Sequence, residues 1–192
     1  MHGFISYSHV DENRVLRLQR HLYPVMHSLE VDVWIDERIF PGEAWDRKIC
    51  EALDRAKLFL FCISSDLLFS KYVDQVELKQ AREKYKRGEA LLVPVILRDC
   101  MWEWVEPFAG LQAVPKNGRA IQLWTPQDTG YADAARRIGV MLRNHMAGAA
   151  PWWTTPPQPK RMHRLRSFVG GRRVAPFATP QPCLRGSTRS LP

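Results

Sequence analysis

Apolar runs alternate with segments of helical period along residues 1–148. The run at 58–63 (Leu-Phe-Leu-Phe-Cys-Ile) is apolar at every position, as in a central parallel strand that is covered on both faces. Pro94 interrupts the fourth run, although proline cannot donate a ladder hydrogen bond. We predict five strands, at 3–7, 31–35, 58–63, 91–97 and 119–124.

Amphipathic segments separate these runs, with apolar positions every three or four residues. They predict helices at 11–29, from Trp45 to Ala56, at 71–86 and at 131–146. Asp11 stands where it can cap the first of these helices. Strands that alternate with helices predict an α/β domain, in which helices cover a parallel sheet.

The charge of the chain is concentrated at its C-terminal end. The chain has 28 basic and 20 acidic residues, and eight of the basic residues but no acidic residue lie in 149–192. Residues 1–148 therefore carry no formal net charge, which argues against a basic nucleic-acid-binding domain. Residues 149–192 also hold eight of the 14 prolines and show no periodicity. We predict a domain at 1–148 and a disordered tail at 149–192.

The cysteines do not form a metal-binding pattern. Cys50, Cys62, Cys100 and Cys183 make no C-x-x-C pair and no zinc motif, so we predict no metal and no resident cofactor. Cys62 lies in an apolar run and is expected to be buried. The N-terminus does not resemble a signal peptide, and no apolar stretch approaches the ~18 residues of a membrane span. We expect reduced cysteines and a cytoplasmic location.

Ligands of an open doubly wound sheet bind beyond the carboxyl ends of the strands, where the strand order reverses. Polar loops follow the predicted strands at Ser6, Asp36, Ser64 and Arg98. Neither G-x-G-x-x-G nor G-x-x-x-x-G-K-[ST] is present, which excludes phosphate-binding loops of these two kinds.

Two other site types fit the sequence poorly. A phospho-acceptor receiver domain needs acids after the first and third strands, and Asp11 and Asp66 provide them, but no lysine ends the fifth run. A hydrolase could use His9 with Ser6 or Ser8, but the nucleophile elbow is missing.

Five ordered segments resemble the Toll/interleukin receptor (TIR) domain family over about residues 1–147. They are Phe4-Ile5-Ser6-Tyr7-Ser8-His9 with Asp11, Val33-Trp34-Ile35-Asp36, Ile39-Phe40-Pro41-Gly42-Glu43-Ala44-Trp45, Ile63-Ser64-Ser65-Asp66 with Ser70, Tyr72 and Val76-Glu77, and Val93-Pro94-Val95-Ile96-Leu97-Arg98. The last segment resembles the family with Pro94 included, so this proline is consistent with a strand there.

The resemblance implies a flavodoxin-like, three-layer fold with a five-stranded parallel sheet of order 2-1-3-4-5. It also implies membership of the bacterial-type subgroup that cleaves NAD, in which a glutamate on the third helix acts at the nicotinamide–ribose bond. Glu77 matches this position. The family often has Cys or Trp four residues before the glutamate, whereas this chain has Val73, which removes a stacking partner for the ligand.

The chemistry is consistent with a single carboxylate. Nicotinamide leaves NAD as a neutral molecule and needs little acid catalysis, while the ribose becomes oxocarbenium-like. A fixed carboxylate beside the ribose can stabilise this cation. An exposed helix glutamate that serves only solubility is the alternative interpretation of Glu77.

The resemblance and the loops give further candidates for contact with NAD as the substrate. They are Ser6, Tyr7, Ser8, Trp34, Arg38, Ser64, Ser70 and Tyr72. Arg38 would meet a phosphate or a second protomer, or is a solvated charge, and Tyr72 would line the cleft or pack. Trp45 could also stack on a ligand, but its helical spacing favours the core.

Two non-enzymatic roles remain open. TIR domains also serve as adaptors in signalling, and the loop at 37–45 places Ile39, Phe40, Pro41 and Gly42 where another TIR domain, or a second copy, would bind. Self-association through this loop would complete the NAD site in an assembly. The basic tail would bind nucleic acid or an anionic membrane, or would be an extension without function.

Overall fold

The computed structural model of this chain describes residues 1–35, 45–70 and 77–148, with the side chains of 45–47 left out. The loop predicted at 37–45 lies almost wholly outside these residues. The tail predicted at 149–192 and the first part of the helix predicted at 71–86 lie outside them as well.

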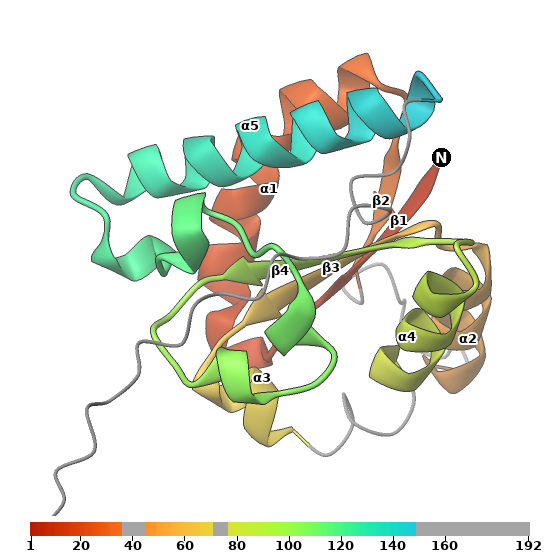
Figure 1. Ribbon diagram of the computed structural model, residues 1–192, viewed down its shortest axis with the longest axis horizontal. Coiled ribbons are helices and arrows are strands. Elements are labelled where there is room, and N and C mark those ends of the chain that lie inside the picture. Colours follow the sequence, from red (N-terminus) through yellow and green to blue (C-terminus); the bar gives the residue numbers. More distant parts are fainter. Residues whose placement is uncertain (36–44, 71–76, 149–192) are drawn as a thin grey trace, which may run out of the picture. The chain divides into compact units, whose positions relative to one another are not determined.

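The described strands form one parallel sheet. They are β1 (His2–Ser6), β2 (Asp32–Trp34), β3 (Leu58–Ile63) and β4 (Leu91–Ile96). Their order is β2-β1-β3-β4, and all three neighbouring pairs are parallel (Figure 1). The α/β class, the first four predicted strands and their order 2-1-3-4 are therefore confirmed.

The prediction of a fifth strand at 119–124 is wrong, because these described residues do not form a strand. These residues contain a 3-10 helix, Ile121–Leu123, in which Ile121 is buried. The apolar positions that suggested a strand therefore reflect burial of a short turn. Beside the free edge of β4, Val114 forms an isolated parallel bridge with Val95. Its amide donates to the Pro94 carbonyl oxygen at 2.9 Å, and its carbonyl accepts from the Ile96 amide at 2.8 Å.

Proline is tolerated in β4 because of the direction in which its nitrogen points. The amides of Leu91 and Leu97 donate toward β3, to Lys57 and Ile63, both at 2.9 Å. Backbone groups alternate in direction along a strand, so position 94 faces the free edge instead. A proline there removes no hydrogen bond between β3 and β4.

Helices cover both faces of the sheet. The helices α1 (Glu12–Ser28) and α5 (Gln127–Met146) lie side by side on one face, and α2 (Trp45–Arg55) and α4 (Leu78–Lys86) cover the other (Figure 1). The short α3 (Ser65–Phe69) lies at the carboxyl end of β3. The segment after β4 contains the 3-10 helices Trp102–Trp104, Phe108–Gly110 and Lys116–Gly118. None of the described helices is both long enough and apolar enough to cross a membrane.

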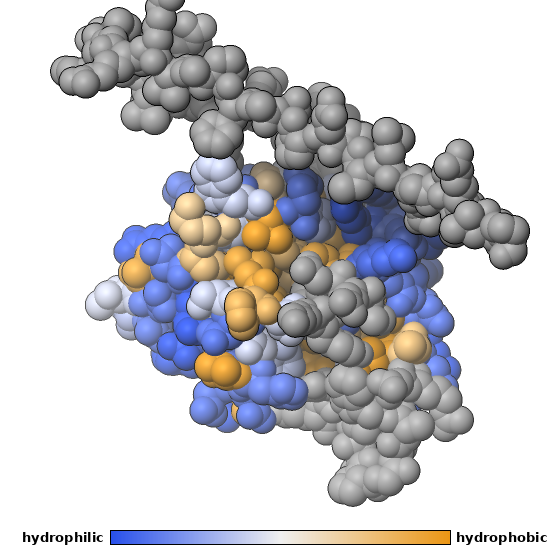
Figure 2. All heavy atoms as spheres, turned by 90° about the horizontal axis from the view of Figure 1, so that it is seen from below, coloured by the Kyte–Doolittle hydropathy of each residue, from blue (hydrophilic) through white to orange (hydrophobic). Residues whose placement is uncertain are grey.

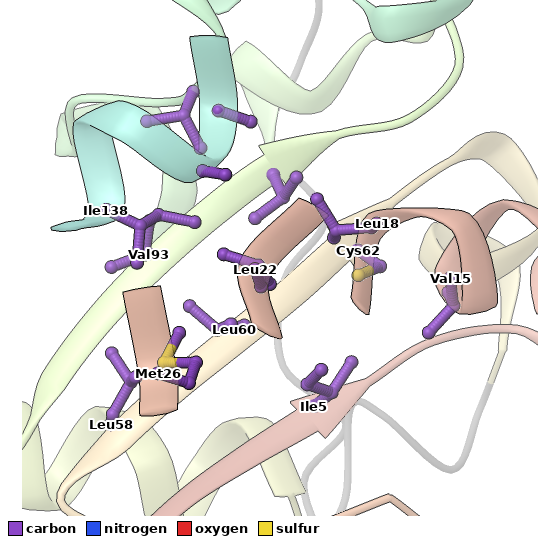
Figure 3. Close-up of a cluster of buried hydrophobic side chains, with 14 of the residues drawn as sticks. Ile5, Val15, Leu18, Leu22, Met26, Leu58, Leu60, Cys62, Val93 and Ile138 are labelled. Carbon is purple, nitrogen blue, oxygen red and sulfur yellow. The ribbon is translucent and has the colours of Figure 1, made fainter. Parts of the chain in front are cut away.

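The core has two layers, one on each face of the sheet. Figure 3 shows the layer under α1 and α5, where Leu18, Leu22 and Ile138 pack on Ile5 and Leu60 of the sheet. Cys62 lies in this layer and is fully buried, as its apolar run predicted, and burial raises the pKa of its thiol. The second layer is built on Phe4, Phe59 and Phe61 of the sheet. Each strand thus contributes alternate side chains to opposite layers.

The close approach of α1 and α5 depends on a glycine. A Cβ atom at position 139 would lie 2.8 Å from Cγ1 of Val25. Alanine in a helix usually stabilises it by about 1 kcal/mol relative to glycine. Here we expect Gly139→Ala to lower the free energy of unfolding by about 1–3 kcal/mol, because it overpacks this contact. Urea denaturation would measure the change.

A second variant identifies the cause. Val25→Ala in the Gly139→Ala chain removes the clashing methyl groups and should recover part of the loss. A Gly139→Ala protein as stable as the wild type would contradict this account of the helix pair.

Candidate functional site

The winding of the sheet reverses between β1 and β3. The chain passes from β1 to β2 on one side and from β3 to β4 on the other, so the carboxyl ends of β1 and β3 border the crevice where such sheets bind ligands. β1 ends at Ser6, and α3 begins directly after the end of β3.

An ionic cluster joins the segments that follow β1, β3 and β4. Arg98 pairs with the carboxylate of Asp11, with Nε 2.8 Å from Oδ1 and Nη2 donating to Oδ2 at 3.1 Å. The contact between Nε and Oδ1 is an ion pair rather than a hydrogen bond. Nη2 of Arg98 also donates to Asp66 at the start of α3. Asp11 is fully buried, whereas Asp66 is half-exposed.

The charges of the cluster support one another. The hydrogen bond from Arg98 lowers the pKa of Asp66, and hydrogen bonds to Asp11 and Asp66 raise the pKa of Arg98. Both carboxylates are therefore engaged by a guanidinium rather than open to a metal ion. This arrangement argues against a phospho-acceptor receiver site, which needs these acids to hold Mg²⁺. Within the described ranges, no group of three or more His, Cys, Asp and Glu side chains is placed to hold a metal.

The predicted capping role of Asp11 is wrong. Asp11 occupies the N-cap position of α1, but its side chain makes no capping hydrogen bond. The carboxylate is bound by Arg98 instead, because a buried charge is stabilised more by an opposite charge than by one amide.

Glu77 belongs to the helical layer opposite α1 and α5. It directly precedes α4 and is 8% exposed. Among the described residues, the buried polar and charged side chains are those of Ser6, Asp11, Ser64 and Glu77. A glutamate on a helix surface would be exposed, so its burial argues against the interpretation that Glu77 serves only solubility.

Ser6 faces the same side of the sheet as Glu77. Phe4 points into the layer under α2 and α4, and side chains alternate along a strand, so Ser6 points there as well. Its Oγ is buried and has no hydrogen-bond partner among the described residues. Trp34 belongs to this side too, because its ring stacks on Phe4 with centroids 5.1 Å apart. The structure therefore places Ser6, Trp34 and Glu77 on one face.

Other candidates have different surroundings. Tyr7 packs on the opposite layer, under α1 and α5, and Ser8 precedes the 3-10 helix His9–Asp11 with its carbonyl accepting from the Asp11 amide at 2.7 Å. The Ser64 hydroxyl accepts from the Leu67 amide at 3.2 Å and so caps α3. Ser70 ends α3, where its amide donates to a backbone carbonyl.

The pairing of His9 with Ser6 that a hydrolase would use is not formed in the described part of the chain. The hydroxyl of Ser6 has no hydrogen-bond partner there, and the ring of His9 makes an edge contact with Tyr7, with centroids 5.8 Å apart. Arg38, Ile39, Phe40, Pro41, Gly42 and Tyr72 lie outside the described residues, so their roles stay predictions.

Three surface hollows lie beside the sheet. One lies beside α1 and β2 and includes Tyr23 and Val33, a second lies between α5 and β4 and includes Val93 and Met141, and a third lies between α2 and the strands β1 and β2 and includes Gly3 and Trp34. None of the three is lined by Ser6 or Glu77. The crevice remains the candidate site, because ligands of such sheets bind beyond the carboxyl ends of the strands.

The contact of Arg98 with both Asp11 and Asp66 was not predicted from the sequence. The sequence does contain a signal, since Asp11, Asp66 and Arg98 follow three strands whose carboxyl ends meet at one edge of the sheet. Opposite charges at such positions predict an ion pair between loops.

The chain is similar to proteins of one family. Residues 4–138 match the model of the family described as "TIR domain". A Sinorhizobium fredii protein named "Uncharacterized protein y4lF" is 33% identical over 135 residues, which are 70% of this chain and 42% of that protein. The chain thus matches less than half the length of that relative. The family match includes Ser6, Asp11, Asp66, Glu77 and Arg98.

Removal of Arg98 would leave a buried charge without its partner. We expect Arg98→Met to lower the free energy of unfolding by about 3–5 kcal/mol, because Asp11 has no access to water. Urea denaturation would measure the loss. Adding Asp11→Asn to Arg98→Met removes the stranded charge and should recover part of it. A loss below about 1 kcal/mol would show that the cluster behaves as a surface ion pair.

Proposed function

Because the chain belongs to the TIR domain family, we propose that it is an NAD+ nucleosidase that cleaves the nicotinamide–ribose bond, with Glu77 as the central catalytic residue. Domains of the TIR type typically interact with other TIR domains in signalling. The observation that carries the enzymatic proposal is the burial of Glu77 directly before α4, on the face of the sheet to which Ser6 points.

The proposed reaction needs a carboxylate that is fixed in place. The bond between C1′ of the ribose and the ring nitrogen breaks, and its electron pair leaves with nicotinamide, which becomes neutral. The Glu77 carboxylate stabilises the positive charge that develops on the ribose. Water then attacks C1′ and releases a proton, which gives ADP-ribose. If a nucleophile within the same ADP-ribosyl group attacked C1′ in place of water, a cyclic product would form instead.

Neighbouring groups would orient the substrate. The Ser6 hydroxyl, which has no hydrogen-bond partner among the described residues, is available to donate to a ribose oxygen. Trp34 lies on the same face of the sheet but lines a hollow with His2 and Gly3, at the amino end of β1. The Arg98 cluster fixes the segments after β1, β3 and β4. NAD is the substrate in this proposal, and no resident cofactor takes part.

Glu77→Gln tests the catalytic role. We expect it to lower kcat for nicotinamide release by at least about 100-fold, because an uncharged amide stabilises the ribose cation poorly. The assay uses high protein concentration, since the proposed enzyme is activated by self-assembly. Glu83→Gln is the matched control, because it removes the same charge from an exposed position on α4. Equal turnover in the wild type and Glu77→Gln would refute the catalytic role.

A second function is an interaction module that works without catalysis. Two of the most exposed apolar side chains among the described residues are Phe69, 89% exposed at the end of α3, and Trp104, 80% exposed after β4. Figure 2 shows hydrophobic side chains at the surface of the face that carries α3. Exposed apolar groups near one end of the sheet favour contact with another protein.

Phe40→Ala tests the interaction role of the loop at 37–45. We expect it to weaken self-association or binding to another TIR domain, measured by sedimentation equilibrium, because apolar contact area is lost. Tyr23→Ala, which removes an exposed aromatic ring from α1, is the control. If association were unchanged by Phe40→Ala, the loop would not be the interface. If function survived Glu77→Gln but not Phe40→Ala, the chain would act as an adaptor.

A further inference from the structure

Helix α2 ends without the usual glycine. The last four carbonyl groups of a helix lack partners within it, and a glycine in a left-handed conformation often helps to satisfy them. Ala56 and Lys57 alone connect α2 to β3. The Ala56 amide donates to Ala52 at 3.0 Å, which leaves the following carbonyls in need of another donor.

Lys84 of α4 provides these donors. Its Nζ lies 2.9 Å from the Leu53 carbonyl oxygen, 2.5 Å from that of Asp54 and 3.2 Å from that of Ala56. An ammonium group has three donors, and all three are directed to the end of α2. A cation at this position also interacts favourably with the negative end of the helix dipole.

Gln80 adds a second contact between the same helices. Its Nε2 donates to Oδ1 of Asp54 at 2.5 Å. Residues 80 and 84 are four apart and lie on one face of α4. This face therefore binds the C-terminal end of α2 along a full helical turn.

Helix α4 rests on the sheet through a short apolar stripe. It spans nine residues, of which Leu78 and Ala81 are buried and Tyr85 is partly buried against the same core layer. A helix of this length is not stable by itself in water. The polar contacts of Lys84 and Gln80 therefore add to this apolar packing in fixing α4.

We infer that Lys84 is a positioning residue for Glu77. Glu77 directly precedes α4, so its carboxylate is placed by the position of this helix. By binding the last carbonyls of α2, Lys84 makes α2 and α4 one unit and sets where Glu77 lies at the crevice. The catalytic part of this inference rests on the proposed function.

Lys84→Met tests the inference in the full chain. It keeps the length of the side chain and removes the ammonium group. We expect kcat for nicotinamide release to fall at least about tenfold, with KM within about twofold, because a displaced carboxylate stabilises the transition state poorly. Lys79→Met, at an exposed position of the same helix, should match the wild type.

A double-mutant cycle separates positioning from general damage. If Lys84 acts through Glu77, Lys84→Met causes no further loss of turnover in a Glu77→Gln chain. An equal loss in both backgrounds, or a Lys84→Met enzyme as active as the wild type, would overturn the inference.

Hydrogen exchange gives a readout that does not need turnover. We expect Lys84→Met to speed exchange of the Ala81 and Arg82 amides, near the Glu77 end of α4, while β3 and β4 stay protected. If the wild-type protein releases no nicotinamide, the proposed function is refuted. Hydrogen exchange would then still test the role of Lys84, because it does not depend on turnover. Unchanged exchange at Ala81 and Arg82 would refute the positioning role.

Discussion

The buried carboxylate of Asp11 is the constraint around which the carboxyl end of the sheet is arranged. A fully buried charge needs a partner, and Arg98 supplies it from the segment that follows β4, two strands away from β1. Arg98 also reaches Asp66 at the start of α3, so one guanidinium joins the segments that follow three strands. Apolar packing alone cannot hold these three segments in fixed positions relative to one another, because they contribute few apolar side chains.

Both helical layers combine apolar packing with polar contacts between their helices. Helices α1 and α5 pack closely, as the approach of Gly139 to Val25 shows, and Arg17 and His21 of α1 also contact Asp128 at the start of α5. Helix α4 packs on the second core layer and is also joined to the end of α2 by the polar contacts of Gln80 and Lys84. Polar contacts are directional, so they place a side chain more exactly than a broad apolar surface does. A catalytic carboxylate benefits from this kind of attachment.

The sequence predicts the strands best where burial is complete. Residues 58–63 are apolar at every position and form β3 with the predicted bounds. The run at 119–124 was wrongly predicted to be a strand, because burial of Ile121 in a 3-10 helix gives the same local pattern of apolar residues as a short strand. Asp11 was placed correctly at the start of α1, but its partner lies 87 residues away, and periodicity carries no information about such a contact. The order 2-1-3-4 came from the family resemblance rather than from the residues.

The charges at the crevice bear on how a dinucleotide would bind there. Asp11, Asp66, Glu77 and Arg98 together make three carboxylates and one guanidinium, a formal net charge of −2. Under the proposed function, this balance would attract the positively charged nicotinamide ring and repel the pyrophosphate. The pyrophosphate would then need cations that lie outside the cluster, since Asp11 and Asp66 already engage Arg98. Arg38, which the sequence places in the loop after β2, is one candidate for that role, beside its alternatives as a contact to a second protomer or a solvated charge. If it binds the pyrophosphate, the loop and Glu77 would act on opposite ends of one ligand.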